Sequence, residues 1–534
     1  MGQKRMTDDE IASVRSQLTE YDERIERQSA LIEAQRQRIE TLERILAEGP
    51  ERGVMVDRRT ALKAGGLAGL LALGAGAGTA SADPNPSGRI GTENRPIETL
   101  YTEALDGGLT ENQAVSGLFG PGLRSDGASL AVDAGPGLEI VDGRLALAVQ
   151  FIHEPDDLDE VLDGMDQDED GTYVITNVHE LQAMNADREA DYRLDNDIDA
   201  IHTALWNDGD GFDPIGESAS RFAGSFDGDG HTVDGLTIDR PGPGTWGTGL
   251  FGVTDTGVTI ANVVLTNVDV TGGSLVGGLV GETVSGTVEA SSVSGAVSGS
   301  GAVGGLIGEL GADVLDSFAT ATVTGGARVG GLVGDILGGT VETSFAAGSV
   351  SGGDRVGGLV GRNSDGIVET SFAAGSVSGG DHVGGLIGVN EYVVNDSFAI
   401  GSVDGDSEVG GLIGRNEDFT LIDVTNSFAT GAVIGTSAVG GLVGVDVDDR
   451  VSESYWDVPA SGWDTSDGGT GIGDLADDPP AEGMVGDDLD PDLESEFDFD
   501  DTWETVSEDD PDAEEDDYPI LQAIDRAAQL EVRG

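Results

Sequence analysis

The sequence predicts an all-β fold, a β-helix-like solenoid of about eight coils, preceded by an N-terminal α-helical coiled coil. Alternation of apolar and polar residues inside each repeat indicates strands, and a separate heptad pattern near the start of the chain indicates the coiled coil. A fixed period of 26 to 30 residues is typical of solenoids, in which each repeat forms one turn. The repeated unit is the hexapeptide VGGLVG, with Val/Ile exchange at its fifth position, beginning at Val276, Val303, Val329, Val356, Val383, Val409 and Val439.

Residues 1–50 carry the heptad pattern. Its seam positions recur at alternating steps of three and four, at Ile11, Val14, Leu18, Tyr21, Ile25, Gln28, Ile32, Gln35, Ile39, Leu42 and Leu46. The polar Gln28 and Gln35 favour one register while weakening the seam. We expect the helix to end at Gly49-Pro50 and to support a homo-oligomer. A single solvated helix is the alternative.

Residues 51–82 resemble an export signal. Arg58 and Arg59 precede Lys63 and an uncharged run rich in Gly and Ala, which ends with Ala80 and Ala82 around Ser81. Paired arginines before such a run resemble a twin-arginine signal, and the ending matches an A-x-A cleavage site. The chain is therefore expected at the cell surface or outside the cell. Residues 64–82 nearly suffice to span a bilayer, so a retained membrane anchor is the alternative.

Four further segments follow along the chain. We expect a loop-rich linker with short β-segments at 83–172, a solenoid lead-in at 173–245, the repeat solenoid at 246–475 and an acidic closing segment at 476–534. In the linker, the runs LAV and LEIV flank Gly-Pro-Gly, and LALAV follows Asp142-Gly143, which indicates hairpin-like pairing.

Each period of the array is expected to contribute three short strands, because apolar and polar residues alternate between glycine-rich turns, as they do from Val341 to Phe345. In stacked coils a residue must fit its own copies about 4.8 Å above and below. Glycine then permits tight turns and close backbone approach, while Val and Leu form apolar columns. One aromatic residue recurs at the same phase in successive periods, which predicts a ladder pointing into the core, with an exposed binding ladder as the alternative. Its members are Phe318, Phe345, Phe372, Phe398, Phe428 and Tyr455.

Composition indicates a protein adapted to concentrated salt. The 534 residues include 100 Asp and Glu against 27 Lys and Arg, which gives a formal net charge of -73, and no lysine follows Lys63. At about 1 M salt the Debye length falls to roughly 3 Å, so neighbouring carboxylates barely repel one another. Such a surface excludes nucleic acid as a partner, and the absence of cysteine excludes disulfides and thiol chemistry. Disorder or an acidic partner-binding tail are alternatives that suit the closing segment better than the apolar repeats.

The repeats resemble the GLUG-motif family, named for a Gly-Leu-hydrophobic-Gly repeat. The segment YVITNVHELQAMNADREADYRLDNDIDA resembles the lead-in that precedes GLUG arrays, and SYWDVPASGWDTSDGGTG with YPIL resembles their closing segment. The resemblance covers residues from about Tyr173 to Leu521. It implies a role at the surface or in secretion, since the family includes adhesin-like proteins and zinc metallopeptidases that cleave immunoglobulin A.

The motifs favour a non-catalytic protein. A zinc peptidase needs HExxH, whereas His153 and His179 are each followed by glutamate without the second histidine. We therefore predict no catalytic residues. The alternative is a β-helical hydrolase or lyase acting on polysaccharides, which needs a carboxylate pair about 5 to 9 Å apart. The irregular acidic segment 195–213, with Trp206, is where an exception to uniform coils is expected.

Asp166, Asp168 and Asp170 form the one metal candidate. With Gly171 they match the D-x-D-x-D-G opening of a calcium loop, in which alternate carboxylates wrap a hard cation. The twelfth position is Asn177 rather than glutamate, so the expectation is no cofactor, with calcium as the alternative.

These observations predict an exported, halophilic cell-surface protein with a role in adhesion or cell-envelope interaction. Its partner would be a cell-surface glycan or protein, with self-association through the coiled coil. Membrane contact is expected only if residues 64–82 are retained.

Overall fold

The computed structural model describes residues 123–125, 130–132, 138–141, 144–147, 154–155, 157–242, 246–417, 424–472, 497–499, 502–506, 517–524 and 526–531. The predicted coiled coil at 1–50 and the export signal at 51–82, with Arg58, Arg59, Ala80 and Ala82, lie outside the described residues. The chain divides into two compact units, Met1–Ala148 and Val149–Gly534, and each is described by itself.

The first unit contains two antiparallel hairpins. Strand β1 (Leu123–Ser125) pairs with β2 (Leu130–Val132), and β3 (Leu138–Val141) pairs with β4 (Arg144–Leu147). The second hairpin joins the LEIV run to its successor across Asp142-Gly143, a dipeptide that favours the two-residue hairpin turn. The LAV run instead pairs with the preceding residues 123–125.

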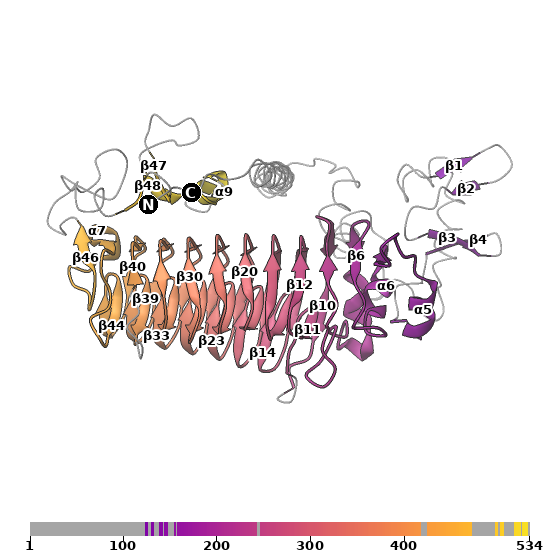
Figure 1. Cartoon of the computed structure of the whole chain (residues 1–534), viewed down its shortest axis with the longest axis horizontal. Helices are drawn as coiled ribbons and strands as arrows, with labels where there is room; N and C mark the ends of the chain where they lie inside the picture. The colour runs from indigo at the N-terminus through magenta and orange to yellow at the C-terminus, as the bar shows by residue number, and fades with distance from the viewer. Residues whose placement is uncertain are drawn as a thin grey trace, which may run out of the picture. The chain divides into compact units, whose positions relative to one another are not determined.

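The second unit is a parallel β-solenoid (Figure 1). Its coils stack so that each strand pairs with the equivalent strand of the next coil, forming four sheets that we call I to IV. Sheet I has seven strands, the first from the hexapeptide that begins at Val276. They are β14 (Leu275–Gly277), β18 (Ala302–Gly304), β23 (Ala327–Gly330), β28 (Asp354–Gly357), β33 (Asp381–Gly384), β38 (Ser407–Gly410) and β43 (Ser437–Gly440).

Sheet II has eight strands, and all of them except the first follow the glycine pair of a hexapeptide. They are β11 (Phe251–Thr254), β15 (Val280–Thr283), β19 (Ile307–Leu310), β24 (Val333–Ile336), β29 (Val360–Asn363), β34 (Ile387–Asn390), β39 (Ile413–Asn416) and β44 (Val443–Asp446). With seven strands in sheet I and eight in sheet II, the stack has about seven turns, close to the predicted eight.

Sheet III has ten strands and extends into the lead-in. They are β5 (Tyr173–Ile175), β6 (Tyr192–Leu194), β8 (Phe226–Asp227), β12 (Val258–Ala261), β16 (Gly286–Glu289), β20 (Asp313–Leu315), β25 (Thr340–Glu342), β30 (Ile367–Glu369), β35 (Val394–Asn395) and β40 (Val424–Thr425).

Sheet IV has seventeen strands, because most coils cross it twice. They are β7 (Ile198–Asp199), β9 (Thr232–Asp234), β10 (Thr237–Asp239), β13 (Val264–Thr271), β17 (Ser292–Ser298), β21 (Phe318–Ala319), β22 (Thr322–Thr324), β26 (Phe345–Ala346), β27 (Val350–Ser351), β31 (Phe372–Ala373), β32 (Val377–Ser378), β36 (Phe398–Ala399), β37 (Val403–Asp404), β41 (Phe428–Ala429), β42 (Val433–Ile434), β45 (Tyr455–Asp457) and β46 (Thr470–Ile472).

A typical coil therefore contains five short strands, as in the run β28, β29, β30, β31 and β32. The prediction of three strands per period is wrong. Corner residues in left-handed conformation, such as Thr343 at φ 50° and Thr370 at φ 47°, divide what looked like one alternating strand into two.

The hexapeptides align in register, and their glycines are required by close backbone contact. Val303 pairs with Val329, which pairs with Val356, and the glycine that follows each valine pairs likewise. A Cβ atom at Gly331 would lie 2.1 Å from the carbonyl oxygen of Gly358 in the next coil. Only a residue without a side chain fits there, which explains why the hexapeptide keeps its glycine pair.

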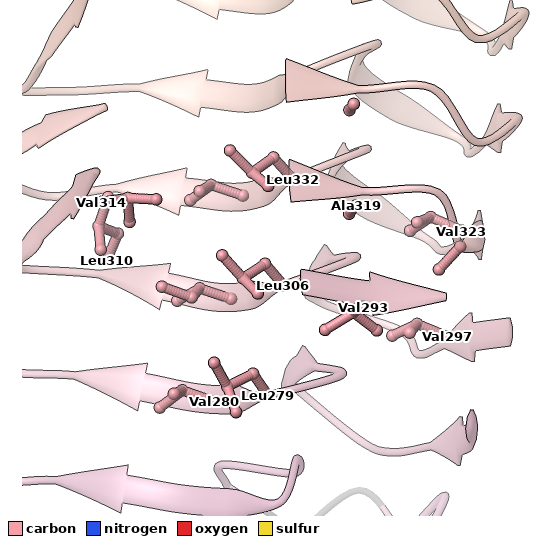
Figure 2. Close-up of a cluster of buried hydrophobic side chains, with 14 of the residues drawn as sticks. Leu279, Val280, Val293, Val297, Leu306, Leu310, Val314, Ala319, Val323 and Leu332 are labelled. Atoms are coloured by element: carbon pink, nitrogen blue, oxygen red, sulfur yellow. The ribbon is translucent and has the colours of Figure 1, made fainter. Parts of the chain in front are cut away.

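The core is a set of apolar columns inside the coils. Figure 2 shows Leu279, Leu306 and Leu332 on successive coils, and all three are fully buried. The alanines that follow the aromatic residues also point inward, as Ala319 does in the same view. In-register repetition thus gives one continuous core, as predicted for stacked coils.

Short helices and side-chain contacts lie at the two ends of the stack. Helices α5 (Leu158–Gly164), α6 (Val178–Ala183), η3 (Ile201–Leu205) and η4 (Asn207–Gly209) belong to the lead-in. At the other end, α7 (Val458–Ser461) follows β45, and the last sheet II strand is closed by Ser466 and Asp467. The Ser466 hydroxyl accepts a hydrogen bond from the Val443 amide at 2.8 Å, and the Asp467 carboxylate accepts one from the Asp446 amide at 2.8 Å. These contacts satisfy an edge that would otherwise be open to pairing.

A C-terminal hairpin completes the second unit. It consists of β47 (Trp503–Val506) and β48 (Asp517–Leu521), which are antiparallel, and is followed by α9 (Arg526–Glu531). Among the described residues, no helix is both long and apolar enough to cross a membrane.

Candidate functional site: an outward aromatic ladder and a charged corner

The aromatic ladder points outward. Rings of Phe318, Phe345, Phe372, Phe398 and Phe428 stack in order, with successive centroids 4.8 to 5.0 Å apart and planes within 6° of parallel. The buried rungs belong to a hydrophobic cluster separate from the solenoid core. The prediction that this ladder points into the core is wrong.

The corner before each aromatic residue explains the reversal. Thr343, in left-handed conformation, interrupts the alternation, so that Ser344 and Ala346 are the fully buried inward residues and Phe345 lies on the outside. Buried serines fix this corner from coil to coil, because the Ser344 hydroxyl accepts from the Ser317 amide at 3.1 Å and donates to the Glu342 carbonyl at 2.8 Å. A serine precedes the aromatic residue in each of these repeats. A polar residue that recurs where the strand pattern expects an apolar one is the sequence signal for this corner.

The C-terminal hairpin covers most of the ladder. Trp503 and Leu521 are fully buried, and they pack with Phe497 and Ile524 against Phe372, Phe398, Phe428 and Tyr455. The Trp503 ring lies 5.4 Å from that of Phe428 at 48°, and the Phe497 ring meets Tyr455 edge-on at 5.8 Å. Such tilted and edge-to-face pairs are the favoured geometries for aromatic contacts.

Two side-chain hydrogen bonds accompany this packing. The Trp503 indole donates to the Asp396 carboxylate at 3.3 Å, and the Tyr518 hydroxyl donates to the Asp457 carboxylate at 2.9 Å. Burial is the main cause that raises the pKa of Asp396, and the charge of Asp498 raises it further. Phe345 lies at the edge of the covered cluster and is only partly buried, and Phe318 is partly buried outside it. The ladder therefore extends beyond its cover.

A charged corner breaks the uniformity of the coils on sheet II. The outward position that is Glu282 in β15 becomes Glu309, Asp335 and Arg362 in the next three coils. Further along, the same column holds Val389, Arg415 and Val445. The column is not visible within any one repeat, because its residues come together only when the coils stack in register.

Ion pairs connect this corner with strands of sheet I and with residues that directly follow strands of sheet II. Arg328 contacts Asp335 at 2.8 Å, and Arg362 contacts Glu391 at 2.8 Å. Arg415 contacts both Glu408, at 3.0 Å, and Glu417, at 2.8 Å. The imidazole of His382 lies 2.7 Å from Asp354 and 3.4 Å from Glu408. His382 is thus part of a network of charged side chains that spans three coils.

Burial dominates the electrostatics of the corner. The fully buried carboxyl of Asp335 has a pKa raised by desolvation, which Arg328 only partly offsets. The pKa of Glu309 is raised by burial and, to a lesser extent, by Asp335 and Glu282. Both carboxyls therefore hold a proton more readily than ordinary Glu and Asp side chains do.

The predicted calcium loop is a turn that closes on itself. One oxygen of Asp168 accepts hydrogen bonds from the amides of Asp170 and Thr172, both at 3.0 Å. Its other oxygen lies 3.4 Å from Arg193. Burial raises the pKa of Asp168, but the two amide hydrogen bonds and Arg193 together outweigh burial, so the net pKa is lowered. In the described part of the chain, no group of three or more His, Asp or Glu is arranged to hold a metal ion.

The irregular segment 195–213 contributes packing residues. Trp206 is 1% exposed, with its ring 6.2 Å from that of Phe212 and 5.4 Å from that of His179. Leu205, the residue before it, is exposed. The segment also departs from the regular coils through η3 and η4, and a second departure lies at the charged corner of sheet II.

Comparisons with known proteins bear on the repeats. Residues 405–434 match the family model described as the GLUG motif, and this span covers one coil from β38 to β42. A segment of 76 residues is 45% identical to halomucin from Haloquadratum walsbyi, covering 13% of this chain and 1% of halomucin. The chain thus carries the GLUG motif that its hexapeptides predicted, and it spans about one hundredth of the length of this curated relative.

Two solved structures are also similar. A proposed immunoglobulin A1 protease from Bacteroides ovatus matches at a TM-score of 0.37 and 19% identity, over 67% of this chain and 94% of that one. An IgA1 protease structure matches at a TM-score of 0.33 and 18% identity, over 53% of this chain and 21% of that one.

Proposed function

We propose that the chain is an exported, halophilic cell-surface protein whose solenoid acts in adhesion or cell-envelope interaction without catalysis. The GLUG motif and the similarity to halomucin support a halophilic surface protein. The observation that carries the proposal is the in-register stack, in which inward Val, Leu and Ala columns repeat while polar and acidic residues lie outward. A stack of this kind is a stiff scaffold that presents a long surface.

The acidic outer surface suits contact in concentrated salt. With a formal net charge of -73, copies of the chain repel one another in dilute solution, and molar salt removes most of that repulsion. Adhesion would then rest on short-range contacts, such as hydrogen bonds to a glycan or protein. Self-association through the predicted coiled coil at residues 1–50 would multiply these contacts.

Export is tested on the native protein. We expect the mature chain in the medium or on the envelope to begin at Asp83, directly after Ala82, by mass and N-terminal sequence. An intact Met1 in the membrane fraction would show that the signal is not cleaved, and would favour anchoring through residues 64–82. A chain found only in the cytoplasm would end the proposal.

Binding is tested in molar salt with purified protein. We expect retention on glycan arrays or on isolated cell envelopes, and no sugar release from any polysaccharide offered. Arrays and envelopes that retain no more of this chain than of an unrelated acidic halophilic protein would contradict an adhesive role.

A second candidate function rests on the charged corner. Glu309 and Asp335 occupy paired positions on adjacent strands, beside Arg328, and strand spacing places such backbones about 4.8 Å apart. Two carboxyl groups roughly 5 Å apart are the spacing used by retaining glycosidases. Sugar release that is abolished by Glu309→Gln, and preserved by Glu282→Gln, would favour a polysaccharide-active enzyme.

Calcium at Asp166, Asp168 and Asp170 stays a prediction. Asp168 already caps its own turn and contacts Arg193, so a bound ion would have to displace that guanidinium. Calorimetric titration of the full chain with calcium in molar KCl tests this, with Asp168→Ala as the control. Heat that is unchanged in the variant would exclude this site.

A further inference from the structure

The C-terminal hairpin is an addition to the stack. Its two strands pair with each other in a separate antiparallel sheet, whereas the coils pair in parallel. In the sequence, 24 residues, 473–496, separate the last strand of the stack from Phe497. The aromatic cluster beneath the hairpin is distinct from the solenoid core. Removing the hairpin would therefore expose the ladder and leave the inward columns intact.

Like charges meet where the hairpin docks. Residues 473–517 include 22 Asp and Glu and no Lys or Arg. Both described hydrogen-bond acceptors on the coils are carboxylates, Asp396 and Asp457. Arg526, which follows the hairpin, pairs with Glu504 of the hairpin. Docking thus joins an apolar contact to electrostatic repulsion.

Carboxylates also flank the site on the coil surface. Glu369 interacts electrostatically with Glu342, which stands one coil before it in sheet III, and with Asp396. Asp498, on the hairpin side, acts on Asp396 across the contact. Such repulsion acts over about 10 Å at 0.1 M salt but only about 3 Å at 1 M.

We propose that the C-terminal hairpin is a salt-gated cover for the outward aromatic ladder, docked in molar salt and released as ionic strength falls, before the coils unfold. Apolar packing of Trp503 and Phe497 holds the cover in place once the carboxylates are screened. Dilution restores the repulsion, and the hairpin leaves as a unit. Phe372, Phe398, Phe428 and Tyr455 then become exposed to solvent. This proposal is independent of the function proposed above.

Thiol labelling of the full chain tests the cover, because the chain has no cysteine of its own. Ile400→Cys places a thiol at a partly buried position packed against the hairpin cluster. Val403→Cys reports on the solenoid core, since Val403 is fully buried in the same coil. Thr320→Cys is the exposed reference. Thr320 lies two residues after the uncovered Phe318, and Ile400 lies two residues after the covered Phe398.

In 4 M KCl we expect slow labelling of Ile400→Cys and Val403→Cys and fast labelling of Thr320→Cys. On dilution, Ile400→Cys should approach the Thr320→Cys rate at a salt concentration where Val403→Cys stays protected. If both protected thiols open together at one concentration, the hairpin leaves only with the fold and the proposal is overturned. Fast labelling of Ile400→Cys in 4 M KCl overturns it as well.

Two further variants separate the causes. Trp503→Ala in the Ile400→Cys background should raise labelling in 4 M KCl about a hundredfold, since it removes the central buried anchor. Asp498→Asn should move the release to lower salt, because it removes the carboxylate that acts on Asp396 across the contact. If release does not move, salt acts on hydrophobic packing alone, and the electrostatic gate is wrong.

Discussion

The inner columns of the solenoid and its outer aromatic ladder are built alike, from identical residues in register, but they are buried differently. Leu332 is buried by its own coil and the coils beside it. Phe428 is equally buried, but its cluster includes Trp503 and Leu521 of the C-terminal hairpin, and Phe318, beyond the hairpin, is only partly buried. Repetition therefore aligns residues, whereas burial of an outward column needs a second element.

The largest effect is expected where the inner columns allow no side chain. Gly331→Ala should lower the free energy of unfolding by about 3 to 5 kcal/mol, because the new Cβ would lie 2.1 Å from the carbonyl oxygen of Gly358. Gly338→Ala is the matched control, since a Cβ there has no atom within 4 Å. Denaturant unfolding in molar salt measures both. Equal stability of the two variants would mean that the coils adjust to side chains at the glycine pair.

The ladder gives the next effect, and it should depend on position. Phe428→Ala is expected to cost about 3 to 4 kcal/mol, since the ring is fully buried between neighbouring rungs and the hairpin. Phe318→Ala removes the same ring from an uncovered rung and should cost about 1 kcal/mol. The comparison uses unfolding midpoints at one salt concentration. Equal losses would show that stacking between rungs, rather than the cover, determines the contribution.

A polar column inside sheet II offers a finer test. Asn363, Asn390, Asn416 and Asp446 hydrogen-bond in series, each contact at 2.9 Å, while the same column is Leu310 and Ile336 in earlier coils. Asn390→Leu leaves a donor of Asn363 and an acceptor of Asn416 without partners, which should cost about 2 to 3 kcal/mol.

Replacing Asn363 together with Asn390 by leucine should cost less than the sum of the two single changes, because the two amides are removed as partners. A double-mutant cycle from unfolding free energies measures this coupling. Additive losses would contradict a column that acts through its internal hydrogen bonds.

A residue's environment is predictable from the sequence when its neighbours are copies of itself in adjacent coils. It is not predictable when its neighbours come from elsewhere in the chain. The glycine pair and the leucine columns are decided by their own copies, so the period was sufficient to predict a stacked solenoid. The direction of Phe345 is decided by the left-handed Thr343 one corner earlier, which alternation alone does not reveal. The burial of Phe428 depends on Trp503, 75 residues away in the sequence, which no local pattern reports.

The charged corner escaped prediction for a related reason. Its members, such as Glu309, Asp335 and Arg362, occur once per repeat and form a site only when coils are stacked in register. These residues are 26 or 27 positions apart in the sequence, but they lie on adjacent strands of the sheet. Once the period is known, reading residues down each column is the procedure that would have found this corner.

The smallest expected effect is the pH dependence of the corner. Burial raises the folded-state pKa of Asp335 above its value in the unfolded chain, so the folded protein binds this proton more tightly. The resulting stabilisation is fully present below the unfolded pKa and is lost as pH rises through the folded pKa. The stability of the wild type relative to Asp335→Asn, measured by unfolding midpoints in molar salt, should therefore rise as pH falls from neutrality towards 3.8, the ordinary pKa of Asp. Asp381→Asn, an exposed change in sheet I, is the control that should leave this slope unaltered. A wild-type advantage that shrinks on acidification would mean that the Arg328 ion pair outweighs burial at this site.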